Sequence, residues 1–141
     1  MADTGAGATL TLATTTNSLT VRSMTLPEQT IDTLDISALD TSNYMEMIPT
    51  DLADPGELSV EILYDGTEAA PSLGVAETVT VTFPKVDSTN TNDGATLAGT
   101  GFIKGFKFPD LQVGELQIAT MTIQFDGGAN SGTEPTWTAG V

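Results

Sequence analysis

Two short segments of alternating apolar and polar residues constrain the fold of this chain more than any other feature. Residues 57–64 alternate Leu, Val, Ile and Tyr with mostly polar side chains, and residues 77–83 alternate Val and Phe with Thr before Pro84. In an extended chain, successive side chains point to opposite faces, so this period of two places the apolar residues together on one face. Both segments are therefore predicted to form half-buried β-strands.

Further strand signals cover residues 9–13, 19–24, 96–108 and 115–125. The glycines within 96–108 predict a bent strand, and the change of apolar parity within 115–125 predicts a bulge or a strand with both faces covered. Only residues 67–73 favour a helix, and Pro71 limits it to a short one. About six to eight strands at short spacing predict an all-β chain, or a mainly β chain with one short helix, folded as a β-sandwich or barrel.

The 141 residues suit one domain, which we assign to residues 1–141. Three segments show no clear alternation: 37–55, 86–95 and 127–141. We interpret residues 37–55 as a long inter-strand loop and residues 127–141 as a C-terminal arm, with residues 1–8 as a short N-terminal arm. No stretch has the length of a membrane span, and the N-terminal residues lack the positive charge of a signal peptide. We therefore expect no membrane binding.

The charge balance disfavours nucleic-acid binding by contact. Four basic residues face nineteen acidic ones, for a formal net charge of −15. Phosphate recognition needs clustered Lys and Arg, and the largest basic group here is the pair Lys104 and Lys107. The acidity either serves solubility or provides a surface that must not adhere to DNA.

The residues for common catalytic and metal sites are missing, because the chain has no histidine and no cysteine. Carboxylate pairs such as Asp32 with Asp35, or Asp51 with Asp54, could support glycosidase-type chemistry, but such spacings arise by chance among nineteen acidic residues. Residues 87–94 resemble a calcium loop only superficially, and a polar hairpin tip explains them better. We expect no enzyme activity, no cofactor and no metal.

The long segment 37–55 carries apolar side chains that a solvated loop would not need. Either they pack onto the domain's own core or they contact another subunit, and we favour the second interpretation. Trp137 leaves the same two alternatives open. The residues that we expect at contacts between subunits are Tyr44, Met45, Glu46, Met47, Ile48, Pro49 and Trp137.

Seven segments follow one another in a characteristic order: 25–32, 35–37, 44–49, 54–60, 78–84, 98–103 and 115–127. An Asp- and Thr-containing strand leads into a long loop, a Gly-containing turn opens the next strand, and later segments supply a Phe-Pro strand end and a closing hairpin. In order and character these segments resemble the tail tube proteins of long, flexible-tailed (siphovirus-type) bacteriophages. The chain departs from that pattern in its shorter, Pro-broken connecting helix and its longer 86–95 hairpin.

The resemblance implies a structural virion protein that forms homohexameric rings stacked into a hollow tube. The loop at 37–55 would reach an adjacent ring, and DNA would pass through an acidic lumen without specific binding during genome ejection. Partners would be other copies of the chain, the tape-measure protein and the tail-tip or terminator proteins. The protein would be assembled in the host cytoplasm and reside in the tail.

Two other classes share this strand-rich, acidic composition. One is a different β-sandwich structural subunit, such as that of a secretion needle. The other is a carbohydrate-binding or adhesin module, which would need exposed aromatic side chains for stacking on sugars. One Trp, two Tyr and the lack of a secretion signal argue against the binding module.

Overall fold

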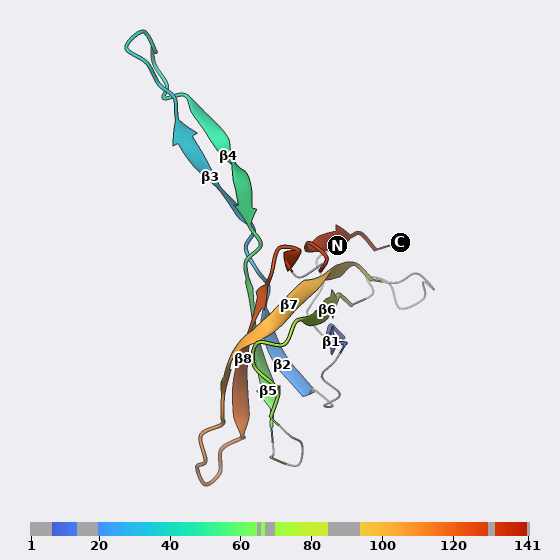
Figure 1. Ribbon diagram of the computed structural model, residues 1–141. Helices are drawn as coiled ribbons and strands as arrows, with labels where there is room; N and C mark the ends of the chain where they lie inside the picture. Colours follow the sequence, from blue (N-terminus) through green and yellow to red (C-terminus); the bar gives the residue numbers. More distant parts are fainter. Residues whose placement is uncertain are drawn as a thin grey trace.

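The computed structural model describes residues 7–13, 20–64, 66, 70–84, 94–129 and 132–140. These residues form nine β-strands and no α-helix (Figure 1), so none of the described segments is a helix able to cross a membrane. The prediction of an all-β fold is confirmed. The strands are β1 (Thr9–Leu12), β2 (Thr20–Thr25), β3 (Thr30–Asp35), β4 (Met47–Asp54), β5 (Glu57–Leu63), β6 (Glu77–Thr82), β7 (Thr96–Lys107), β8 (Ile118–Phe125) and β9 (Thr136–Thr138).

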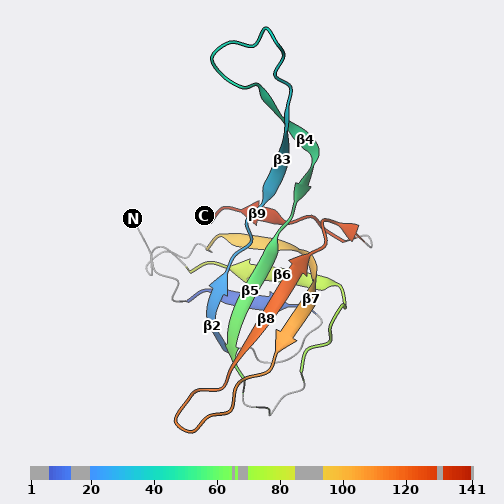
Figure 2. The ribbon, with the colours of Figure 1, turned by 90° about the vertical axis from the view of Figure 1, so that its left-hand side faces the viewer.

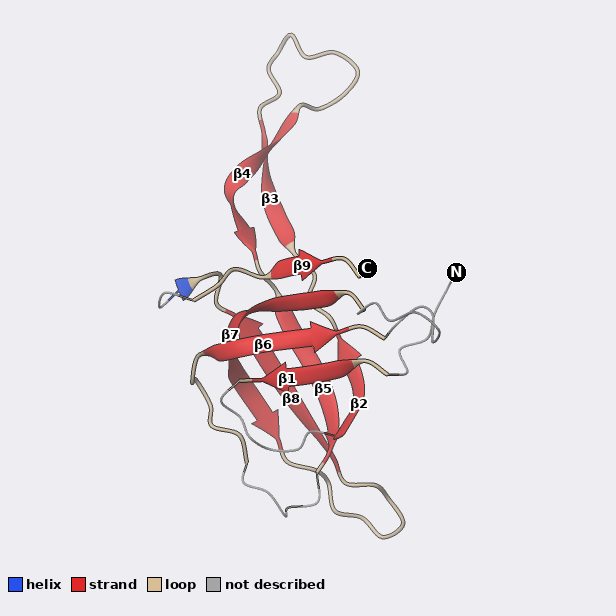
Figure 3. Cartoon of the chain, turned by 90° about the vertical axis from the view of Figure 1, so that its right-hand side faces the viewer, coloured by secondary structure: helices blue, strands red, loops and turns tan. Residues whose placement is uncertain are grey.

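The body of the protein is one antiparallel sheet folded into two layers. Its strand order is β1-β6-β7-β8-β5-β2, and β9 joins the first half of β7. Strand β6 pairs with residues 96–101 of β7, whereas β8 pairs with residues 101–107, so β7 passes from one layer to the other. Strands β1 and β6 cross β5 and β8 at a steep angle (Figures 2 and 3). The result is a sandwich with crossed layers.

The predicted bend of β7 is confirmed where the two layers meet. A Cβ at Gly101 would lie 2.8 Å from the carbonyl oxygen of Gln124, so only glycine allows the backbones of β7 and β8 to come this close. The register then shifts between Ile103 and Gly105, which places an extra residue, Lys104, in a bulge. A close backbone approach followed by a bulge turns the strand.

The core lies between the two layers and is built from the inward residues of every long strand. In β5 and β8 each second residue is buried, as the alternation in the sequence predicts. The buried apolar residues that form the core are Leu12, Leu58, Val60, Ile62, Val79, Val81, Leu97, Ile103, Ala119, Met121, Ile123 and Phe125.

Of the two alternatives predicted for the last long strand, a bulge or two covered faces, the bulge is wrong. Strand β8 begins at Ile118, and its register with β5 runs without interruption from Leu63–Ile118 to Glu57–Gln124. The apparent change of parity came from Leu116, which lies in the preceding connection and is 63% exposed. Of the segment predicted as a short helix, residues 67–69 lie outside the described residues, and residues 70–73 are not helical. Most of the 86–95 hairpin also lies outside the described residues.

Two segments predicted to be irregular contain strands. Strand β4 occupies most of the second half of the 37–55 segment, and β9 lies within the C-terminal segment 127–141 and pairs with β7. The alternation of β4 is hidden because Pro49 lies inside it and its register with β3 shifts between Ile31 and Thr33. A short strand such as β9 forms because a neighbouring edge is available, which a local pattern does not reveal.

Candidate functional site

Strands β3 and β4 form a separate two-stranded sheet that projects from the body. We call residues 30–54 the arm and residues 36–46 its tip (Figure 1). The arm continues the β2–β5 hairpin of the body: β2 leads into β3 through residues 26–29, and β4 leads back into β5 through Pro55 and Gly56. The six residues of β3 alone span about 20 Å. The pairing of β3 with β4 is what holds the arm in shape.

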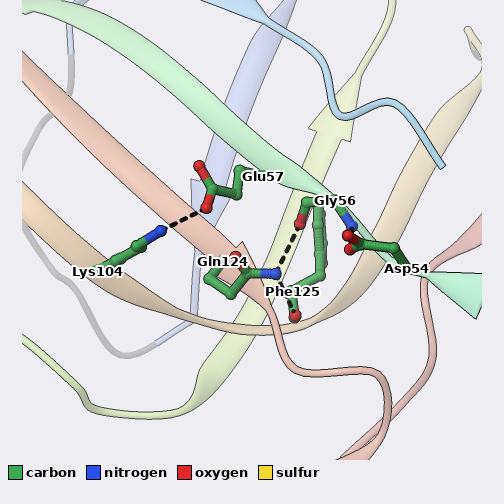
Figure 4. A network of polar contacts seen from close by, with 6 residues as sticks. All are labelled: Asp54, Gly56, Glu57, Lys104, Gln124 and Phe125. Atoms are coloured by element: carbon green, nitrogen blue, oxygen red, sulfur yellow. Dashed lines mark hydrogen bonds and ion pairs between the residues drawn. The ribbon is translucent and has the colours of Figure 1, made fainter. Parts of the chain in front are cut away.

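The arm joins the body at a narrow neck around Gly56. This residue has φ of 86°, and a Cβ there would lie 2.8 Å from both the carbonyl oxygen of Glu28 and the Cβ of Pro27. Its N–H donates to Asp54 Oδ1 at 2.9 Å, and its carbonyl accepts from Gln124 Nε2 at 3.1 Å (Figure 4). Position 56 therefore requires glycine for two reasons: its backbone has a positive φ, and Pro27 and Glu28 leave no room for a side chain.

Hydrogen bonds close the base of the tip. Ile36 N–H donates to the carbonyl of Glu46 at 2.9 Å, and Glu46 N–H donates to Ser37 Oγ at 2.7 Å. Ser37 N–H in turn donates to Asp35 Oδ1 at 2.8 Å. The backbone and side-chain hydrogen bonds from Ser37 lower the pKa of Asp35, because they stabilise its charged form. The tip thus begins and ends in a defined geometry.

The predicted contact residues of segment 44–49 lie on this arm and are exposed. Tyr44 is 85% exposed and Met45 is 73% exposed in the tip, and Met47 and Ile48 remain 48% and 41% exposed in β4. Pro49 lies opposite Thr33 in the strand pairing. The alternative in which these side chains pack on the domain's own core is therefore wrong for this structure, because the arm holds them away from it.

Sequence reasoning missed the apolar residues on β3 and in the rest of the arm. Leu34 lies directly opposite Ile48 across the two strands, so the pair forms an apolar stripe on one face. A signal was present, because Ile31, Leu34 and Ile36 precede the segment that we interpreted as a loop. The missed exposed residues are Ile31, Leu34, Ile36, Leu39 and Leu52.

The arm and its approach are strongly acidic. Between residues 28 and 54 the chain carries seven carboxylates and no basic residue: Glu28, Asp32, Asp35, Asp40, Glu46, Asp51 and Asp54. Asp32, Asp35, Asp51 and Asp54 are exposed to solvent on the arm. No group of three or more potential metal ligands occurs among the residues that the structure describes. The arm therefore presents exposed apolar side chains bordered by negative charge.

Trp137 is separate from the arm. It lies in β9 opposite Leu97, and its ring packs edge-on against Phe83 with 5.0 Å between the ring centres. The side chain keeps 54% of its surface exposed. Strand β9 lies at the end of the body from which the arm projects (Figures 2 and 3). Trp137 thus packs on its own domain, and a contact with a neighbouring subunit stays a prediction.

The opposite end of the body carries a second group of exposed apolar residues. The connection from β7 to β8 at residues 108–117 extends away from the arm (Figure 1). It exposes Phe108, Leu111, Val113 and Leu116. The sequence analysis assigned the two ends of this connection to the predicted strands 96–108 and 115–125, and it gave the residues between them no function.

No family model matches the chain, and no curated protein does. Among solved structures, the chain is similar to one in the cryo-EM structure of the sheath–tube complex of an extracellular contractile injection system, PVC, in the extended state. That match has a TM-score of 0.66 and 10% sequence identity, and it covers 94% of this chain and 88% of the other.

A second similar chain comes from the sheath/tube terminator of the same system in the extended state. Its TM-score is 0.61 at 11% identity, with 86% of this chain and 91% of the other covered. At such low identity the similarity establishes the fold. The chain shares its fold with these two chains, from the sheath–tube complex and the sheath/tube terminator of an extracellular contractile injection system.

Proposed function

We propose that this protein is a structural tube subunit that assembles with copies of itself into stacked rings around a hollow channel. The observation that carries the proposal is the fold: it is shared along most of both chains with structures from a sheath–tube complex and its terminator. The exposed apolar arm supports the same conclusion, because an isolated two-stranded hairpin is marginally stable in water and a partner would complete it.

Ring closure can use two edges of the same sheet layer that pair with no other strand among the described residues. On one side is the outer edge of β2, the last strand in the sheet order. On the other is the end of β7 beyond residue 103, since β6 pairs only with its first half. At the start of the β7 edge, the N–H of Gly74 donates to the carbonyl of Ile103 at 3.0 Å. Edge pairing from copy to copy would remove both open edges by symmetry.

The outward face of this layer is the surface that we propose for the channel wall. Thr120, Thr122 and Gln124 alternate with buried residues of β8 and give a polar, uncharged strip. Beside it, Lys104 pairs with Glu57. We do not propose the acidic lumen that the sequence resemblance implies for this face, because Glu57 and Glu61 of β5 lie there with Lys104 and Lys107 of β7. The arm, in contrast, carries carboxylates and no basic residue.

The arm is proposed to connect successive rings. Its tip lies well beyond the body, so the exposed Tyr44 and Met45 can reach a copy in the next ring while the body takes part in its own ring (Figure 1). In this proposal the remaining predicted contact residues of the arm lie at the border of the contact: Glu46, Met47, Ile48 and Pro49. Trp137 could contribute from the same end of the body.

The proposal extends to three details. The rings are six-fold, DNA passes through the channel without specific binding, and tape-measure and terminator proteins are partners in a virion tail. They rest on the sequence resemblance to flexible-tailed phages. The similar solved structures instead come from a contractile system with a sheath. A tube subunit is the proposal common to the flexible-tailed phage and the contractile system. Binding of a sheath protein around the tube would distinguish the contractile system from the phage tail.

Negative-stain electron microscopy of the purified protein over a range of concentrations tests this function. Rings or hollow tubes are expected, with a rotational symmetry that can be counted in end views. A monomer at every concentration, also after addition of a preformed tail tip or tube end as a nucleus, would contradict the proposal. A glycan-binding screen would then test the carbohydrate-binding alternative.

A further inference from the structure

We propose that the tip of one copy docks onto the opposite end of the next copy, on a surface formed by residues 106–117 and Tyr64. We call this surface the aromatic pole. The inference rests on the proposed tube function and adds which surface receives the arm. Its occupant is a second copy of this chain.

Three rings are clustered at the aromatic pole. Phe106 lies 5.6 Å from Tyr64 and 5.1 Å from Phe108 between ring centres, and each pair is edge-to-face. Tyr64 and Phe108 are 6.4 Å apart. Phe108 is 60% exposed, so this cluster extends from the core into solvent. An aromatic cluster with an open side offers a larger contact surface than isolated side chains do.

The exposed large apolar residues of the described chain gather mainly at two places. Ten of them lie between residues 26 and 52, on the arm and its approach. A second set lies at the aromatic pole, where Leu111, Val113 and Leu116 are 76%, 105% and 63% exposed. Exposed apolar clusters of this kind are typical of protein contacts. Each of the two clusters is therefore a candidate contact surface.

The two clusters face in opposite directions. The arm and the aromatic pole project from opposite ends of the body in each of the three views (Figures 1, 2 and 3). The arm of a chain cannot fold back over the whole body to cover its own pole. Copies placed one after another along the arm direction bring tip and pole together, which is a head-to-tail contact that can repeat without limit.

The side chains at the two surfaces suit each other chemically. The arm presents Met45 and Met47, which are flexible and polarisable, and the pole presents aromatic rings. Methionine sulfur makes favourable contacts with aromatic rings and adapts to irregular surfaces. Burial of both clusters would also stabilise the isolated hairpin. The contact is therefore expected to be driven by apolar burial.

Disulfide trapping tests the docking directly, because the natural chain has no cysteine. A chain carrying both Met45→Cys and Val113→Cys is oxidised under mild conditions and examined on a non-reducing gel. The two positions lie at opposite ends of one copy, so any disulfide between them joins two copies. A ladder of multimers is expected. Mixing the two single variants should give dimers only.

A matched control carries Met45→Cys with Thr80→Cys, because Thr80 lies on the outward face of β6, away from the pole. This control should give no ladder. A ladder from the control but not from the Val113→Cys pair would overturn the docking. So would dimers formed by Met45→Cys alone, since these indicate contact between two arms.

Electron microscopy of the same samples separates this inference from the proposed function. Tubes without the Met45–Val113 disulfide would overturn the docking and leave the tube function standing. Ladders without rings or tubes would support the docking and contradict the tube. Failure of both measurements would overturn both proposals.

Discussion

The ammonium group of Lys104 reaches across β8 to the carboxylate of Glu57, beside the side chain of Gln124 (Figure 4). The bulge in β7 makes this contact possible, because it adds Lys104 to the strand between two paired positions. Both side chains are about half exposed, at 55% and 45%. Water screens such a pair, so its contribution to stability is small, at most about 1 kcal/mol.

Reversing one charge of this pair is expected to cost more than removing it. Lys104→Gln should lower Tm by less than about 4 °C. Lys104→Glu should lower it further, because it sets two carboxylates against each other. The double variant Glu57→Lys with Lys104→Glu should recover most of the loss. Thermal unfolding followed by circular dichroism measures all three. Equal Tm values for Lys104→Gln and Lys104→Glu would show that the pair does not interact.

Gly56→Ala is expected to destabilise the neck of the arm by at least about 2 kcal/mol, since left-handed backbone costs an alanine about 1–2 kcal/mol and the new Cβ also meets Glu28 and Pro27. Gly74→Ala is the matched control, because Gly74 has φ of 76° with no atom within 4 Å of a Cβ. Denaturant unfolding compares the two variants. An equal loss in both would show that the neck has room for a side chain.

Much of the fold could be predicted from the sequence because the body strands alternate cleanly. The strands around Val60, Val79 and Ile123 each bury one parity of residues, which is the pattern that local analysis detects. The bend of β7 was also readable, since glycines inside a strand mark close approach or a bulge. Strand β9 could not be predicted from the local sequence, because it forms by pairing with the free edge of the first half of β7.

The candidate site was predicted in part. The segment with Tyr44, Met45 and Ile48 is held away from the core, as our favoured interpretation requires, but its contact with another subunit stays a prediction. Its strand β4 was missed, since Pro49 and a register shift break the alternation. The aromatic pole was missed because its residues follow one another in a connection and meet Tyr64 only through the fold.

Shortening the tip is expected to leave the body folded and to prevent stacking. Replacing residues 37–45 with Asn-Gly joins Ile36 to Glu46 through a two-residue turn that suits a β-hairpin. The hydrogen bond between those two residues is retained, while Tyr44 and Met45 are lost. Unfolding midpoints should match the natural protein, and electron microscopy should show at most single rings. Normal tubes from this variant would remove the tip from the assembly.

The pH dependence of the tip should follow Asp35. Hydrogen bonds from Ser37 lower the pKa of Asp35, so they stabilise the folded tip above the ordinary carboxyl pKa. That contribution is lost as the pH falls through the lowered pKa, because the protonated group is a weaker acceptor. The chemical shift of the Ser37 amide proton should titrate in this acidic range. In Asp35→Asn the same titration should be absent, and its persistence would point to another carboxylate.

Assembly is expected to strengthen as salt is added. Each chain carries a net charge of −15, and the tip brings Glu46 toward a pole that contains Asp110 and Glu115 beside Lys107. Raising the ionic strength from about 0.01 M to about 0.15 M shortens the screening length from roughly 30 Å to roughly 8 Å, which weakens this repulsion while apolar burial persists.

Light scattering should therefore show a lower concentration for assembly at the higher salt. The variant Asp40→Asn with Glu46→Gln should assemble at low salt as the natural protein does at high salt, because two of the repelling charges at the tip are gone. If added salt instead dissolved the assemblies of the natural protein, attraction between opposite charges would drive the contact. The apolar account of tip and pole would then fail.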